Sequence, residues 1–442
     1  MRQNIDADDA KDGKTHSTDF SFKSSDEPDA IAVSLLTGGS DRPYVFGITK
    51  SLFSTGAVLD LIGSDELDFP EFHTWTGVNF LNLRGSTETE AGILSKVFRI
   101  LLYYARLFLY AAVAKPRIFH ILWNNRFEIF DRTLLMFYYR ILGKRIVLTV
   151  HNVNADKRDS KDSRLNQLTL RIQYRLAHHI FVHTEKMKRE LIDEFNAQSS
   201  RVTVIPFGIN NAVPNTSLSS AVAKRRLGLR ENEKAMLFFG RITPYKGLEY
   251  LIAAFREVLA RNKNYRLIIA GRPDRCEDYW NAIRKEIAGE LQGGQIILNA
   301  TYIPDEETEV YFKAADALVL PYKDIYQSGV LFLGHSFGLP VLAADVGSLK
   351  DDIVDGKTGY VFRPENQADM ARVIEQYFAS DLFANLNDLR REICAFANER
   401  HSWDVVGQTT LGVYAGLLRV PFPMKSLNHD SAGKSLDVKA PS

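Results

Sequence analysis

The sequence predicts an α/β chain of two domains, each built on a parallel β-sheet covered by helices. The chain has 442 residues, which suits two domains of about 200 residues better than one. Short apolar runs alternate with longer amphipathic segments, a pattern typical of βαβ units. The polar stretch 210–223 separates two series of such runs and has the composition of an interdomain linker.

Polar or small residues follow the predicted strands of the first series. These strands are IAVSLLT (31–37), IFHILW (118–123), RIVLTV (145–150) and HIFVHT (179–184). Because parallel sheets bind ligands at the carboxyl ends of their strands, Gly38, Gly39 and His151 are candidate site residues. Two glycines let a ligand approach the backbone closely. The alternative interpretations are a tight turn and a structural histidine.

The second series begins after VTVIPFGIN (202–210). Its predicted strands are AMLFFG (235–240), YRLIIAG (265–271), QIILNA (295–300), ALVLP (317–321) and PVLAAD (340–345). Amphipathic stretches such as GLEYLIAAFREVLARN separate them and predict helices.

Two cations follow the first strand of this series. Arg241 comes directly after AMLFFG, and Lys246 lies five residues further on, before Gly247 and an amphipathic helix. Fixed cations at a strand end beside a helix start form a site for a diphosphate. Arginine adds a bidentate fork and lysine a point charge. The alternative is a solvated loop that carries two ordinary surface cations.

The loop Gln327-Ser328-Gly329-Val330 precedes the apolar helix LFLGHSF. Backbone N–H groups at a helix start bind anions, and glycine allows close approach. The alternative is a simple N-cap in which Ser328 satisfies its own helix, and both interpretations can hold together.

The second half carries five motifs in a fixed order, which are GRITPYKGLEYLIAAF, IIAGRPD, YIPDEETEVYFKAADALVLPY, YQSGVLFLGHSFGLPVLAADVGS and DGKTGYVF. This series resembles the retaining glycosyltransferases of family 4 and covers nearly all of the C-terminal half. TGGSDRPY and LTVHNVN in the first half match the family more loosely. The resemblance implies the GT-B type fold, in which two Rossmann-like domains with parallel sheets face each other across a cleft. It also implies transfer of a sugar from a nucleotide-diphosphate sugar, with retention.

The resemblance assigns roles to individual positions. Arg241 and Lys246 would hold the leaving diphosphate, and His151 would lie under the donor sugar. Further diphosphate contacts would come from Gly38, Gly39, Ser328, Gly329 and Val330, and the nucleotide base would lie near Gly271, Arg272 and Ile303.

The chain departs from this family at two positions. The usual pair of glutamates falls on Ile325 and Leu333, neither of which is acidic. Asp324 or Gln327 is a candidate to replace the first glutamate at the donor sugar, whereas nothing polar adjoins Leu333. Recognition of the sugar and the ribose therefore differs here from the family pattern.

The expected domains are an N-terminal, acceptor-side domain over 29–208 and a C-terminal, donor-side domain over 209–402. By resemblance, 403–420 forms a helix that crosses back to the first domain. Residues 1–28 and 421–442 are polar and without periodicity, so we expect disordered tails there, and the first residues lack the apolar core of a signal peptide.

Charge is distributed unevenly. The net charge is +1, which gives no reason to expect nucleic acid as a partner. From Lys96 to Arg189, however, nineteen lysines and arginines stand against six aspartates and glutamates, interleaved with aromatic residues. Two interpretations stay open. In the first, amphipathic helices pack their aromatic residues into a core while their arginines extend to water. In the second, this segment docks on an anionic membrane that holds a lipid-linked acceptor. Because Arg99 and Arg106 interrupt the apolar stretch 97–114, we expect a helix there and no membrane span.

The sequence gives no sign of a metal or a cofactor. Cys276 and Cys394 lack metal-ligand spacing and fit a reducing compartment. An Asp-x-Asp pattern occurs only at Asp6-Ala7-Asp8, and Walker, GxSxG and GxGxxG motifs are missing. We therefore expect a metal-independent enzyme without a cofactor in the cytoplasm, or at the inner face of the cytoplasmic membrane.

The resulting hypothesis is a glycosyltransferase whose acceptor is a polysaccharide or a lipid-linked sugar. One alternative is another enzyme on the same fold, a nucleotide-sugar epimerase or a phosphorylase. The other is a non-catalytic scaffold in surface-polysaccharide assembly, which the missing glutamates at Ile325 and Leu333 favour.

Overall fold

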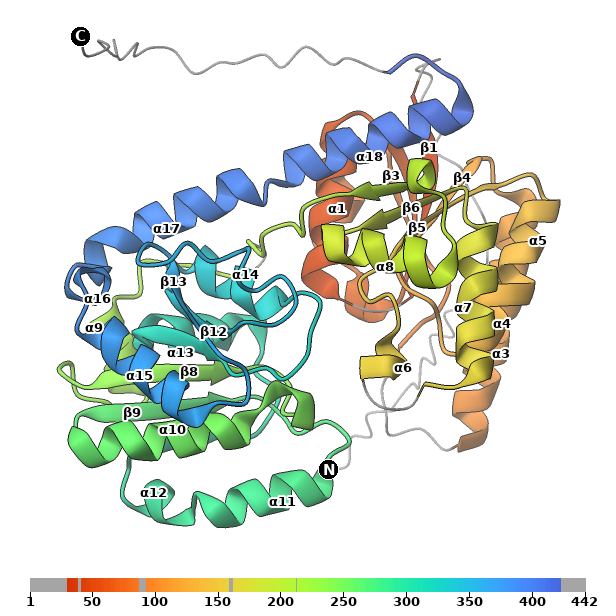
Figure 1. Cartoon of the computed structure of the whole chain (residues 1–442). Helices are drawn as coiled ribbons and strands as arrows, with labels where there is room; N and C mark the ends of the chain where they lie inside the picture. Colours follow the sequence, from red (N-terminus) through yellow and green to blue (C-terminus); the bar gives the residue numbers. More distant parts are fainter. Residues whose placement is uncertain (1–29, 39–40, 87–92, 159–161, 212, 423–442) are drawn as a thin grey trace, which may run out of the picture.

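The computed structural model describes residues 30–38, 41–86, 93–158, 162–211 and 213–422. Within these ranges the chain forms two parallel sheets, each covered by helices (Figure 1). The α/β class and the paired parallel sheets are therefore confirmed. The segment 1–28 and nearly all of 421–442, for which we expect disorder, lie outside the described residues, and the domain limits stay predictions.

The first sheet has seven parallel strands in the order β3-β2-β1-β4-β5-β6-β7. Strand β1 lies beside β4, with Val33 opposite Ile118, so the strand order reverses between them. The strands are β1 (Ala32–Leu36), β2 (Val58–Gly63), β3 (Val78–Asn82), β4 (Ile118–Ile121), β5 (Arg145–Thr149), β6 (His179–Val182) and β7 (Val202–Val204). The sequence analysis did not include β2 and β3.

The second sheet has six parallel strands in the order β10-β9-β8-β11-β12-β13, and its order reverses between β8 and β11. Its strands are β8 (Lys234–Phe239), β9 (Tyr265–Ala270), β10 (Ile296–Asn299), β11 (Ala317–Leu320), β12 (Val341–Ala344) and β13 (Gly359–Phe362). Such reversals leave a crevice at the carboxyl edge of a parallel sheet, where ligands bind.

Helices cover both sheets. The first half contains α1 (Arg42–Ser54), α2 (Pro70–Thr74), α3 (Ile93–Val113), α4 (Glu128–Phe130), a π-helical turn η2 (Asp131–Leu135), α5 (Met136–Ile141), α6 (Ala155–Arg158), α7 (Arg164–Leu176) and α8 (Glu185–Phe195). The second half contains α9 (Ser220–Arg226), α10 (Leu248–Arg261), α11 (Glu277–Glu286), α12 (Ala288–Gln292), α13 (Asp305–Ala314), α14 (Gly329–Ser336), α15 (Gln367–Phe378), α16 (Asp381–Ala384), α17 (Leu386–Arg400) and α18 (Trp403–Leu418). Short 3₁₀ turns are η1 (Asp65–Leu67), η3 (Ser199–Arg201) and η4 (Pro244–Lys246).

Different helices pack on the two faces of the first sheet. Helices α3, α5 and α7 pack their apolar side chains on one face together with residues of β4, β5 and β6. Helices α1 and α18 cover the opposite face. None of the helices in the described part of the chain has both the length and the apolar content needed to cross a bilayer.

The last helix returns from the second half of the chain to the first, as Figure 1 shows for α17 and α18. Its first residue, Trp403, fits between Gly47 of α1 and Gly208, where an added Cβ atom would overlap the indole ring. The indole N–H donates to the carbonyl of Ile209 at 2.8 Å. The missing side chains at these glycines therefore allow α18 to dock on α1.

We expect the substitution Gly47→Ala to lower the thermal unfolding midpoint, because the new methyl group displaces the Trp403 ring at a cost of about 1–3 kcal/mol. Gly416→Ala in α18 is the matched control, since an added Cβ atom there meets no atom within 4 Å. Differential scanning calorimetry of both variants measures the effect. Equal midpoints for the wild type and Gly47→Ala would contradict this account of the docking.

Candidate functional site

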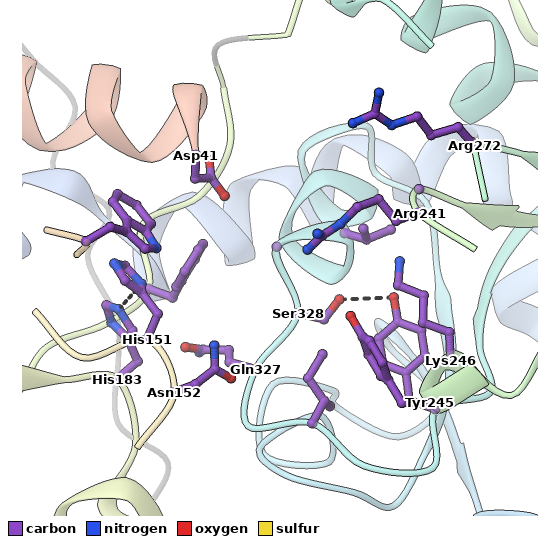
Figure 2. A pocket seen from close by; sticks show the side chains of 17 residues that line it. Asp41, His151, Asn152, His183, Arg241, Tyr245, Lys246, Arg272, Gln327 and Ser328 are labelled. Atoms are coloured by element: carbon purple, nitrogen blue, oxygen red, sulfur yellow. Dashed lines mark hydrogen bonds between the residues drawn. The ribbon is translucent and has the colours of Figure 1, made fainter. Parts of the chain in front are cut away.

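A cleft of about 640 Å³ lies between the carboxyl edges of the two sheets (Figure 2). One wall consists of residues that follow strands of the first sheet, which are Asp41, Trp123, His151, Asn152, His183 and Phe207. The other wall consists of Gly240, Arg241, Tyr245, Lys246, Arg272, Tyr322, Ile325, Gln327, Ser328, Gly329 and Val330, which follow strands of the second sheet. The structure thus brings together eight predicted site residues, which are His151, Arg241, Lys246, Arg272, Gln327, Ser328, Gly329 and Val330.

Lys246 is a buried cation, with only 5% of its surface exposed. Its Nζ lies 5.3 Å from the centre of the Tyr322 ring and 5.9 Å from that of Phe238. No carboxylate among the described residues forms an ion pair with it. Burial, and secondarily the charge of Arg241, lowers the pKa of Lys246 to about 7. An anion placed beside this amine would supply the missing partner.

Two glycines hold the Lys246 ammonium group in this position. Gly247 adopts a left-handed conformation, with φ 66°, between η4 and α10, and an added Cβ atom would overlap the carbonyl of Pro321. An added Cβ atom at Gly240 would lie 3.1 Å from the Lys246 Nζ. Because both positions lack a side chain, the turn closes tightly and the ammonium group fits at the end of β8.

Two arginines stand near this lysine. Arg241 is 64% exposed and donates from Nη1 to Oδ2 of Asp274 at 3.1 Å. Its guanidinium group points into the cleft, toward the wall that carries Asp41 (Figure 2). Removal from water raises the pKa of the Asp41 carboxyl, although the charge of Arg241 acts in the opposite direction. Arg272 follows β9 and lines the same wall as Arg241.

Helix α14 opens onto the cleft at its N-terminus. Ser328 occupies the N-cap position, yet its side chain makes no capping hydrogen bond and its Oγ lies 3.4 Å from the Tyr322 hydroxyl. Among the hydrogen bonds of the described residues, none uses the N–H groups of Gly329 and Val330, while that of Leu331 bonds to the Ser328 carbonyl. Ser328 therefore occupies the N-cap position without capping the helix through its side chain. The two unbonded N–H groups of Gly329 and Val330 face the same space as Lys246.

His151 lies on the opposite wall within an aromatic cluster. Its ring stacks on Trp123 with centroids 4.1 Å apart, and its Nδ1 lies 3.1 Å from Nε2 of His183. His183 in turn directs Nδ1 to the carbonyl of Ile205 at 3.3 Å. A carbonyl only accepts, so His183 Nδ1 carries the proton and His151 Nδ1 donates to His183 Nε2. This leaves His151 Nε2 buried with a free lone pair and no hydrogen-bond partner among the described residues.

Both histidines are neutral. Burial lowers the pKa of His183 to about 4. Burial, and next the neighbouring His183, also moves the pKa of His151 well below its usual range. His151 therefore presents an uncharged nitrogen to the cleft, and the positive charge of the site belongs to the opposite wall.

Other predicted site residues do not line the cleft. Gly38 lies behind Trp123, where an added Cβ atom would stand 2.5 Å from that residue's carbonyl oxygen, and Gly39 is outside the described residues. Asp324 is exposed away from the lining, while Gly271 and Ile303 are buried. The roles assigned to these five residues stay predictions.

The two positions where the family has glutamates are apolar in the folded chain. Ile325 forms part of the cleft wall, and Leu333 lines a neighbouring pocket of about 300 Å³. The carboxylates that line this second pocket are Asp41 and Asp305. Oε1 of Gln327 is buried in the main cleft without a described hydrogen-bond partner, so an acceptor for a hydroxyl group is available beside Ile325.

The sequence analysis did not name several lining residues, notably Asp41, Trp123, Asn152, His183 and Phe207. Trp123 and His183 lie at the ends of the predicted strand runs 118–123 and 179–184, and they follow the observed strands β4 and β6 as His151 follows β5. The strand-end criterion applied to all strands of the first sheet would have found both.

The arrangement suits a ligand with an anionic part and a polar uncharged part. Lys246, Arg241 and the free amides of α14 surround the anionic part, while His151 and Gln327 offer acceptors to hydroxyl groups. Within the described ranges, no group of three or more His, Cys, Asp or Glu side chains is placed to hold a metal ion.

Comparison with known proteins gives matches to both halves of the chain. The family model described as "Glycosyl transferases group 1" matches residues 220–393, and the model described as "Glycosyltransferase Family 4" matches residues 84–213. A D-inositol 3-phosphate glycosyltransferase of Acidothermus cellulolyticus is 28% identical over 246 residues, which is 55% of this chain and 54% of that protein. The chain thus spans about half the length of the curated relatives it matches.

Solved structures resemble the whole fold. Sucrose-phosphate synthase from Thermosynechococcus elongatus superposes with a TM-score of 0.69 at 17% identity, covering 88% of this chain and 99% of that one. Anabaena HepE, solved in complex with UDP and glucose, gives 0.67 at 14% identity, covering 87% and 99%. These likenesses bear on the fold, which is of the GT-B type. Since the two family models together match more than half of its residues, the chain belongs to glycosyltransferase family 4.

Proposed function

We propose that this chain transfers a sugar, with retention and without a metal or a cofactor, from a nucleotide-diphosphate sugar to a glycan or a lipid-linked acceptor. The observation that carries the proposal is Lys246, a buried cation to which no described carboxylate is paired. It shares one cleft with Arg241 and with the amides of α14 that have no hydrogen-bond partner among the described residues. A diphosphate satisfies all three groups at once.

In the proposed reaction the bond between the donor sugar and the diphosphate breaks as the acceptor hydroxyl approaches from the same face. Negative charge grows on the leaving diphosphate oxygen, and Lys246, Arg241 and the N–H groups of Gly329 and Val330 stabilise it. The same phosphate oxygen takes the acceptor proton. His151 Nε2 and Gln327 Oε1 accept hydrogen bonds from sugar hydroxyls, which fixes the orientation of the donor.

Uridine diphosphate sugars are the first donors to test, because the solved structure of HepE contains UDP and glucose. Arg272, which lines the cleft, keeps its expected place near the nucleotide base as part of this proposal. The roles expected of Gly38, Gly39, Gly271, Ile303 and Asp324 stay predictions. We place the reaction in the cytoplasm or at the inner face of the cytoplasmic membrane, where nucleotide sugars are available.

The affinity for UDP should fall as the pH rises above 7. A bound diphosphate raises the pKa of Lys246 from its value of about 7 in the free protein, so binding takes up a proton in this range. The dissociation constant then rises by up to about tenfold per pH unit. Isothermal titration calorimetry across this range measures the slope. Lys246→Met should lose the slope and bind more weakly, whereas Lys246→Arg, which stays charged, should show no slope.

The matched control for this titration is Lys263→Met, which removes an exposed lysine distant from the cleft and should keep the wild-type slope. A pH-independent affinity in the wild type, or an unchanged slope in Lys246→Met, would contradict the assignment of Lys246 to the diphosphate.

Arg241→Ala should reduce turnover about a hundredfold, since losing one charge contact to the leaving group costs about 3 kcal/mol in the transition state. Arg226→Ala, which removes an exposed arginine at the end of α9, is the control and should keep wild-type turnover. The assay follows nucleoside diphosphate release from the sugar donor that gives the largest thermal shift. Wild-type turnover in both Arg241→Ala and Lys246→Ala would show that the donor binds elsewhere.

The same assay separates the alternatives. Incubation with the donor alone, followed by analysis of the sugar, reveals an epimerase if the sugar changes configuration and no acceptor is needed. Binding of the donor without turnover, in the presence of a broad set of acceptors, would favour a non-catalytic scaffold.

Turnover should survive an excess of EDTA, because the proposed site neutralises the diphosphate with Lys246, Arg241 and backbone amides. The control adds magnesium or manganese in excess over EDTA and should leave the rate unchanged. Loss of activity in EDTA that either metal restores would overturn the metal-independent mechanism.

A further inference from the structure

Large apolar side chains are exposed mainly on one part of the surface. Of the seventeen that are exposed among the described residues, thirteen lie between positions 97 and 168. They belong to α3, to the segment from Phe127 through α5, and to the start of α7. Single exposed apolar residues are ordinary, but such a concentration marks an interaction surface.

Helix α3 is apolar on both sides. Its inner side buries residues such as Tyr103, Leu107 and Tyr110 against the first sheet. Its outer side carries an apolar stripe made of Val97, Phe98, Leu101, Leu102, Leu109 and Val113. Phe98 and Leu109 are 66% and 67% exposed. The apolar stripe follows the helical period and has no partner within the described chain.

The neighbouring helices continue this surface. Helices α3, α5 and α7 pack their inner sides into one core cluster on the same face of the sheet, so they form a single layer, as Figure 1 also shows. The Tyr138 hydroxyl donates to the Phe108 carbonyl at 3.0 Å, which joins α5 to α3, and Arg132 donates to Asn166, which joins η2 to α7. The outer sides of this layer add Ile129, Leu134, Phe137, Ile141, Leu165 and Leu168 to the apolar stripe.

Cations border the apolar residues. Arg164, Arg171 and Arg175 are exposed along α7, and neither α3 nor α7 contains an acidic residue. Not every cation between Lys96 and Arg189 is available to contact a partner, since Lys144 is buried and donates to the carbonyls of Ala114 and Pro116. The layer therefore combines exposed apolar side chains with a bordering row of arginines.

We propose that the outer surface of α3, α5 and α7 docks on a bilayer that contains anionic lipids, with the apolar stripe entering the acyl boundary and the arginines contacting phosphate headgroups. Apolar insertion and electrostatic attraction together are the two signals that stable peripheral binding requires.

The surface reaches the acceptor side of the cleft. Arg99, in the second turn of α3, donates to the Ser86 carbonyl at 2.9 Å, and Arg84 of the preceding loop donates to the Gly38 carbonyl at 2.8 Å. Gly38 lies directly behind the cleft residue Trp123. Docking through this surface thus holds the cleft close to the bilayer. If the proposed transferase function holds, the acceptor is lipid-linked and lies in the same membrane.

Vesicle co-sedimentation tests the docking. Wild-type chain should pellet with vesicles of phosphatidylcholine and phosphatidylglycerol, and high salt should weaken this binding without abolishing it, because salt screens only the arginines. The double variant Leu101→Gln/Leu109→Gln should bind at least tenfold more weakly at every salt concentration. Val405→Gln, at an exposed apolar position on α18, is the control and should bind like the wild type.

The double variant Arg171→Gln/Arg175→Gln should lose the part of vesicle binding that high salt weakens. The part of wild-type binding that persists at high salt should stay unchanged. The control for this variant is Lys263→Gln/Lys357→Gln, which removes two exposed lysines of the second half. Wild-type vesicle binding by the Leu101/Leu109 variant would overturn the proposal. A change in sedimentation velocity from dimer to monomer in that variant, with vesicle binding unchanged, would also overturn it and assign the surface to a second copy.

Thermal shift with UDP separates this proposal from the proposed function. The Leu101/Leu109 variant should show the same UDP-induced shift as the wild type, because the altered residues lie outside the cleft. Vesicle binding without any response to UDP would leave the docking intact and contradict the donor site instead.

Discussion

The organisation of this molecule depends on one electrostatic constraint, the burial of the Lys246 ammonium group without a negatively charged partner among the described residues. A buried cation is costly, and the usual compensation is a neighbouring carboxylate. No carboxylate in the part of the chain that the structure describes supplies this compensation, and we propose that a bound anion does. The free N–H groups of Gly329 and Val330 and the guanidinium group of Arg241 add to the same positive potential. The proposed diphosphate would complete this space.

The backbone of the second sheet creates this space, and the first sheet closes it. The strand order reverses between β8 and β11, which separates the strand ends that lead to Lys246 and to Ser328. Gly247, in a left-handed conformation, brings the turn after Lys246 against the Pro321 carbonyl at the end of β11. Opposite them stands a neutral wall, in which burial keeps His151 uncharged. A positive wall that faces the uncharged His151 suits the anionic and the polar part of the proposed sugar diphosphate donor. Trp403 holds α18 on α1 and so links the two halves that form these walls.

The sequence predicted the fold class and much of the positive wall, because those features are local. Arg241, Lys246 and Ser328 directly follow recognisable strands or open a helix. Strand β2 was missed because its run VLDLIG contains Asp60, whose carboxylate accepts from the Tyr110 hydroxyl only after α3 has packed. The partnership of His151 with His183 joins two histidines that are 32 residues apart in sequence and follow different strands. Helix α3 carries apolar residues on its outer as well as its inner side, so periodicity alone left the outer side undecided between core and membrane.

The central claim is that the Lys246 site receives the diphosphate of a donor. A crystal structure of the wild-type chain with UDP tests it most directly. We expect a phosphate oxygen within hydrogen-bonding distance of Lys246 Nζ, with the N–H groups of Gly329 and Val330 and the Arg241 guanidinium bound to the same diphosphate. A UDP molecule bound elsewhere while Lys246 stays without an anionic partner would contradict the account.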